Sequence, residues 1–102
     1  MAVVAKRLGK GTFGTASATQ YTVPVSTTTL VKAITLCNKT ASDATVTLLF
    51  GGTEVIYQHT IKARDTVTIP FLDQIIQAGE TITGLAGTAN AINYYISGKE
   101  VT

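Results

Sequence analysis

Short stretches of alternating apolar and polar residues, separated by turn-forming residues, run through most of the chain. No stretch keeps the 3.6-residue period of an amphipathic helix, whereas alternation with a period of two is typical of half-buried strands. Strands are predicted at residues 19–23, 30–38, 45–50, 53–61, 66–71, 81–85 and 91–97. Short strands at this spacing predict an all-β fold, an antiparallel β-sandwich or jelly roll of seven to eight strands. A barrel of the same strand count fits the pattern as well.

For three segments the sequence also predicts a position in the fold. Residues 30–38 are apolar on both faces, which indicates a central strand covered on each side. Gly51-Gly52 lies between two alternating segments and predicts a tight hairpin turn. The last strand, residues 91–97, is expected to bury one face, formed by Ile92, Tyr94 and Ile96.

The middle of the chain is expected to continue this pattern. Residues 53–61 alternate so that one side carries Val55, Tyr57, His59 and Ile61. In residues 66–71 the inward positions are expected to be Val67, Ile69 and Phe71. Residues 72–78 could form a single helical turn that ends at Gly79, although the segment is too short for a stable helix.

Residues 1–18 differ from the rest of the chain. Gly9, Gly11 and Gly14 fall within six positions, and glycine at this density favours a flexible or extended backbone with little side-chain burial. The sequence therefore predicts a basic, glycine-rich N-terminal arm over residues 1–18, followed by one β-sandwich domain over residues 19–102.

Charge is distributed unevenly along the chain. Residues 1–40 contain five of the eight cations and no acid, so they carry +5. Residues 41–102 contain all six acids and three cations, so they carry −3, and the two parts sum to the net charge of +2. This asymmetry allows a basic segment to dock on an acidic surface of a sister subunit or of another partner. A net charge of only +2 does not by itself argue for a nucleic-acid partner.

The residues expected at such an interface come from the arm and from the last strand. The arm supplies the cations Lys6, Arg7 and Lys10 and the aromatic residue Phe13. Tyr95 follows the expected core residue Tyr94, so it should face outward, where an exposed tyrosine can anchor an interface. A tyrosine that merely covers a neighbouring strand is the alternative for this position.

No catalytic, metal or cofactor site is expected. His59 is the single histidine and Cys37 the single cysteine, which is too few for a zinc site and excludes an intramolecular disulfide. Residues 9–14 fit the pattern G-x-G-x-x-G, but no helix is predicted after the last glycine to bind a phosphate. The chain is also far too short to be a protein kinase, and it lacks the other kinase motifs.

The expected location follows from two further absences in the sequence. No stretch has the length and apolar character of a secretory signal or a transmembrane helix. Synthesis in a cytoplasm and no membrane partner are therefore expected.

Several short motifs, taken in order, resemble small β-sandwich structural proteins of tailed bacteriophages and prophages. They are Tyr21-Thr22-Val23-Pro24, a strand that ends in Cys37-Asn38, Ala78-Gly79-Glu80-Thr81-Ile82 and Ser97-Gly98-Lys99-Glu100. The pattern covers most of residues 19–100, and the proposed arm lies outside it.

The resemblance implies a structural protein of the virion with no catalytic residues. An outer capsid decoration or head-associated protein is expected, which forms a homo-oligomer and binds other virion proteins. A tail-associated accessory protein, or a module that binds carbohydrate on the host surface, is the alternative.

Overall fold

The computed structural model describes residues 2–102, which form nine β-strands and no helix. The strands are β1 (Val3–Thr12), β2 (Ala18–Thr22), β3 (Thr28–Asn38), β4 (Ala44–Phe50), β5 (Thr53–Ile61), β6 (Thr66–Ile69), β7 (Gln74–Ile76), β8 (Thr81–Ala86) and β9 (Ile92–Val101). All pairs between them are antiparallel.

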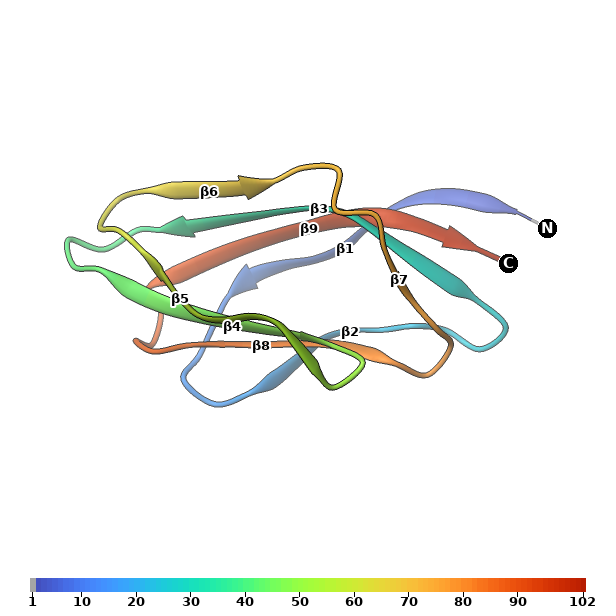
Figure 1. Ribbon diagram of the computed structural model, residues 1–102, viewed down its shortest axis with the longest axis horizontal. Coiled ribbons are helices and arrows are strands. Elements are labelled where there is room, and N and C mark those ends of the chain that lie inside the picture. Colours follow the sequence, from blue (N-terminus) through green and yellow to red (C-terminus); the bar gives the residue numbers. More distant parts are fainter. Residues whose placement is uncertain (1) are drawn as a thin grey trace.

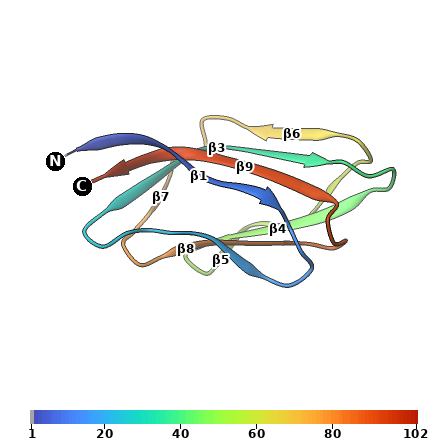
Figure 2. The same cartoon turned by 180° about the vertical axis from the view of Figure 1, so that it is seen from behind.

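The strands form two sheets that pack face to face as a β-sandwich (Figure 1). One sheet has the order β1-β9-β3-β6, with β7 also paired to β3, and the other has the order β2-β8-β4-β5. Seen from behind, β1 and β2 lie at the near edge of the sandwich, while β5 and β7 lie at the far edge (Figure 2). The predicted all-β sandwich is confirmed, as is the central position of β3, between β9 and β6.

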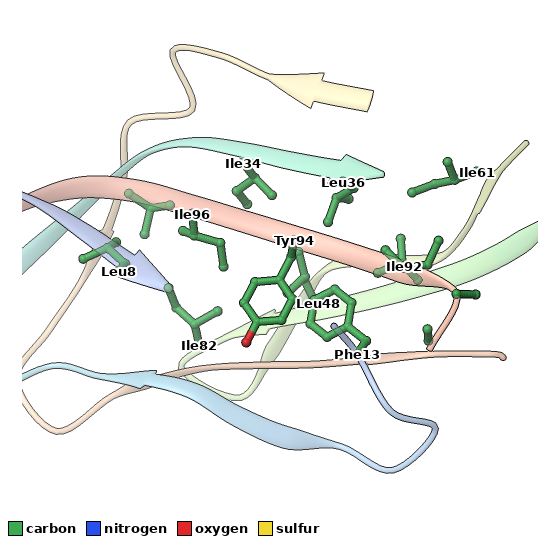
Figure 3. Packing of buried hydrophobic residues seen from close by; sticks show 14 of the residues in the cluster. Leu8, Phe13, Ile34, Leu36, Leu48, Ile61, Ile82, Ile92, Tyr94 and Ile96 are labelled. Atoms are coloured by element: carbon green, nitrogen blue, oxygen red, sulfur yellow. The ribbon is translucent and has the colours of Figure 1, made fainter. Parts of the chain in front are cut away.

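The core lies between the two sheets (Figure 3). The five-stranded sheet contributes Ile34 and Leu36 of β3 together with alternate residues of β9, and the four-stranded sheet contributes Leu48 and Ile82. The inner face of β9 consists of Ile92, Tyr94 and Ile96, as predicted. Each fully buried aliphatic side chain contributes about 1.5–3 kcal/mol, so this layer is the main stabilising term.

The hairpin between β4 and β5 turns at Gly51 and Gly52, as predicted. Their φ angles are 58° and 81°. Positive φ at both central positions matches the twist of the flanking strands, and glycine adopts it without a steric penalty from Cβ.

The predicted flexible arm is wrong, because most of residues 1–18 belong to the sandwich. β1 pairs with β9 along its whole length, from Val3 opposite Val101 to Thr12 opposite Asn93. Two glycines of this segment leave space for the Tyr94 ring: a Cβ on Gly11 would lie 3.1 Å from the hydroxyl oxygen, and a Cβ on Gly9 would lie 3.4 Å from Cε2. Gly9 and Gly11 therefore reflect close packing against an aromatic side chain rather than flexibility.

The segment after β6 also differs from the prediction. Residues 74–76 form the short strand β7, which pairs with β3, in place of the single helical turn. Phe71 was expected to point inward but is 85% exposed, and its φ of 55° lies in the left-handed region. Strand β6 ends at Ile69, so the alternation that would have buried Phe71 stops before it reaches this residue.

In β5, the predicted shared face is broken by irregular pairing with β4. The register shifts between Val46 and Leu48 and again between Leu48 and Leu49. His59 pairs with Val46, and Ile56 pairs with Leu48, whereas Tyr57 falls between these pairs. Because each bulge adds an unpaired residue, the period of two is lost and β5 mixes its faces.

Candidate binding face

The outer surface of the five-stranded sheet is built on the alternation of β9. Its inward residues are buried, whereas its outward residues are exposed or half-buried: Asn93, Tyr95, Ser97 and Lys99. Tyr95 lies at the middle of this surface, paired on one side with Lys10 of β1 and on the other with Thr35 of β3. Paired residues of neighbouring antiparallel strands point to the same side of a sheet, so all three face outward.

Two shallow hollows lie on either side of Tyr95, and cations line both. The first, about 450 Å³, is lined by Lys10 and Lys39 together with Thr35, Cys37 and Asn93. The second, about 510 Å³, is lined by Arg7, Lys32 and Lys99 together with Ser97. The term basic face is used below for these five cations and Tyr95. It gathers five of the eight cations of the chain on one side of one sheet.

Acidic side chains lie almost entirely elsewhere. None lines either hollow, and the one acid paired with a cation of the basic face is Asp73, 2.6 Å from Lys32 Nζ. The other acids lie on β5, in turns, or at the end of β9: Asp43, Glu54, Asp65, Glu80 and Glu100. The charge asymmetry along the sequence is therefore also an asymmetry in space, and Arg7, Lys10, Lys39 and Lys99 form no ion pair among residues 2–102.

Tyr95 is held in place by one of these cations. The Arg7 guanidinium lies 5.9 Å from the centre of the Tyr95 ring, a cation–π contact. Tyr95 remains 49% exposed, so its ring is available to a partner. The prediction that Tyr95 faces outward agrees with this geometry.

Of the five predicted interface residues, Arg7, Lys10 and Tyr95 lie on the basic face. Lys6 also lines the second hollow, but it pairs with Gly98, an inward position, and its Nζ lies 3.3 Å from Glu100 Oε1. The interface assignment of Phe13 is corrected, because this side chain is only 1% exposed and belongs to the core.

Sequence reasoning missed three cations of the basic face. Lys99 continues the outward alternation of β9, which a longer predicted last strand would have included. Lys32 falls at a register shift of β3 between Val31 and Ala33, a bulge that a period-two pattern does not reveal. Lys39 follows the end of β3 directly, and its orientation depends on the turn.

A second polar cluster joins the two sheets on the inner side. The Tyr21 hydroxyl of β2 donates to Glu100 Oε2 of β9 at 2.5 Å and lies 2.7 Å from Thr29 Oγ1 of β3. Burial, together with the hydrogen bond to Glu100, raises the pKa of Tyr21 to about 12. Because its polar groups bond to each other, this cluster is a structural contact between the sheets.

Cys37 and His59, the single cysteine and the single histidine of the chain, lie on different sheets. Cys37 lies on the outer side of the five-stranded sheet, where it pairs with Asn93 and Thr66. His59 lies on β5, the edge strand of the other sheet, where it is exposed and lines a groove with residues of β5 and β6. The five-stranded sheet separates their side chains, so they do not form a Cys–His pair.

Residues 2–102 contain neither a metal-binding cluster nor a membrane-spanning helix. No group of three or more His, Cys, Asp or Glu side chains in this part of the chain could hold a metal ion. The same residues contain no helix that is long and apolar enough to cross a membrane.

No protein-family model matches the sequence, and no curated protein matches it. The basic face and the fold are therefore the observations on which a function can be argued.

Proposed function

We propose that this chain is a non-enzymatic structural protein of a tailed-phage virion, which binds an acidic surface of another virion protein through its basic face. An outer capsid decoration or head-associated protein fits this role. The proposal joins the motif resemblance of residues 19–100 to the geometry of the five-stranded sheet.

The observation that carries the proposal is the separation of charge between two sides of the molecule. Five cations surround Tyr95 on one sheet face, no acid lines either hollow, and Asp73 is already paired with Lys32. Unpaired cations on one surface favour a partner of opposite charge and accelerate its association. A half-exposed tyrosine at the centre supplies the apolar anchor that charged pairs alone lack.

A protein partner is favoured over a nucleic acid. Proteins that bind single strands commonly offer several aromatic side chains on which successive bases stack. Tyr95 is the one aromatic residue among those that line the two hollows on their outer side, since Tyr94 points into the core. The remaining acids of the chain would also repel a long polyanion that extends beyond the face.

The first experiment locates the protein. Immunogold labelling of particles from cells that produce the phage should mark the virion, and the labelled position separates head from tail. Particles without label, in preparations where the protein is abundant in the lysate, would contradict the proposal.

The second experiment tests the basic face with a matched pair of charge reversals. Lys10→Glu lies on the face, and Arg64→Glu makes the same change in net charge within the turn between β5 and β6. We expect Lys10→Glu to reduce binding to particles that lack the protein by about tenfold or more, because a like charge then faces the acidic partner. Arg64→Glu should bind like the unmodified chain.

Three results would contradict this proposal or point to a different partner. Equal binding by Lys10→Glu and Arg64→Glu would show that the basic face does not bind the particle. Tight binding to DNA, with a strong salt dependence lost in Lys10→Glu, would replace the protein partner by a nucleic acid. Specific hits on a glycan array would favour the alternative of a host-surface module.

A further inference from the structure

The edge of the sandwich formed by β5 and β6 is open and apolar. β5 is the edge strand of the four-stranded sheet, and β6 is an edge strand of the five-stranded sheet. A groove of about 450 Å³ runs between them and reaches the core at Leu36, which is fully buried. Its walls are lined by Val55, Ile56, Tyr57, His59, Val67 and Ile69.

The opposite edge of the sandwich is closed by the chain itself. There β1 leads into β2 through Phe13, whose ring fills the core between the sheets. At the β5–β6 edge the connection is the turn at residues 62–65, which contains no aromatic residue to fill the space between the sheets. Here Tyr57 is 65% exposed and Val55 is 47% exposed. Clustered apolar side chains at an edge strand are a liability unless another surface covers them.

The charges along β5 indicate what covers this edge. Glu54 lies at the start of the strand, and Lys62 follows its last residue. Neither side chain forms an ion pair among residues 2–102. β5 therefore has an unpaired negative charge at its start and an unpaired positive charge just after its end. Two antiparallel copies of the strand would place these opposite charges side by side.

We infer that two copies of this chain pack along their β5–β6 edges, antiparallel about a two-fold axis near Gln58. Such an axis relates residues whose numbers sum to twice 58, so Glu54 of each copy lies opposite Lys62 of the other. It also places Tyr57 of each copy opposite His59 of the other, which brings the two apolar grooves together. A two-fold interface uses the same patch on both subunits, and β5 meets this requirement in both charge and apolar character.

The contact is made by side chains rather than by a continuous intermolecular sheet. Gln58 has a φ of 45°, and its N–H donates to Thr47 Oγ1 at 3.0 Å within the same chain. A bulge of this kind disrupts the regular ladder of an edge strand and so opposes strand addition. The groove shares no residue with the basic face, so this inference does not depend on the proposed function.

Sedimentation equilibrium of the purified chain from about 1 μM to about 1 mM tests the inference. We expect a reversible monomer–dimer equilibrium. Tyr57→Glu should shift it to monomer, because a charge would then be buried in the apolar contact. The control is Tyr95→Glu, a similar change on the outer face of the other sheet, which should leave the dimer intact. A monomer at every concentration, or an assembly with an odd number of subunits, would overturn the inference.

A charge swap tests the antiparallel alignment itself. Glu54→Lys and Lys62→Glu should each raise the dimer Kd by about tenfold, because each places two like-charge pairs across the axis. The double variant restores opposite charges and should return the Kd to within about threefold of the original. Circular dichroism checks that each variant remains folded. Additive weakening in the double variant would rule out this alignment.

Discussion

The ring of Phe13 stacks on the ring of Tyr94, with the ring centroids 4.4 Å apart and the planes inclined by 21°. Phe13 lies between β1 and β2, and Tyr94 is the third residue of β9. The Phe13 N–H also donates to the Ile92 carbonyl at 2.9 Å. The N-terminal segment is thus fixed to the centre of the core by both its backbone and its side chain.

Removal of the Phe13 ring should therefore destabilise the whole domain. We expect Phe13→Ala to lower the free energy of unfolding by about 3–5 kcal/mol, measured by urea denaturation. Phe71→Ala is the matched control, because the Phe71 side chain is exposed, and its effect should stay within about 0.5 kcal/mol. Equal effects of the two substitutions would contradict the placement of Phe13 in the core.

Gly98 lies where no side chain can be accommodated. A Cβ at this position would be 2.1 Å from the Leu30 carbonyl oxygen, a backbone atom that cannot move without a shift of β3. Gly98→Ala should lower the free energy of unfolding by about 3 kcal/mol or prevent folding. At Gly14 a Cβ would meet no atom within 4 Å, so Gly14→Ala should be tolerated. Thermal unfolding of the two variants, followed by circular dichroism, makes the comparison.

Tyr21 should make the stability of the domain depend on pH in the alkaline range. Burial and the hydrogen bond to Glu100 raise its pKa from 10.0 to about 12, so the folded state keeps a proton that the unfolded chain releases. Its contribution is complete below about pH 10 and is lost as the pH rises toward 12. Tyr21→Phe should make the decline in this window shallower, as measured by urea denaturation at successive pH values. An unchanged slope would show that the phenol is not the titrating group.

Cys37 provides a chemical probe of the basic face. Its side chain lines the same hollow as Lys10 and Lys39. A bulky maleimide attached to Cys37 should block binding to particles, while the circular dichroism spectrum stays unchanged. Cys37→Ser removes the thiol and should bind normally whether or not the reagent is added. Full binding by the modified chain would argue that the partner approaches from another side.

The strands with regular pairing were predictable from sequence, because there the alternation and the fold agree. Residues 92–96 show this best, since every second residue is buried as the pattern indicates. β5 was predicted with its correct bounds, but its alternate residues do not share one face as predicted, because register shifts against β4 add residues that a period of two does not reveal.

The prediction of a flexible N-terminal arm was wrong for a different physical reason. A glycine-rich segment has the same sequence pattern whether its glycines make the backbone flexible or leave space for a neighbouring side chain. The neighbour of Gly11 is Tyr94, more than eighty positions away in the sequence, so no local pattern could identify it. The same holds for the basic face, in which Arg7 and Lys99 meet only after β1 has paired with β9.

The alternation of β9 divides two tasks between neighbouring residues. Positions 92, 94 and 96 hold the two sheets together, while positions 95, 97 and 99 meet whatever lies outside. A substitution at an outward position changes recognition and leaves the core intact. The surface of this sheet can therefore be altered over evolutionary time, or by design, to suit a new neighbour without a loss of folding stability.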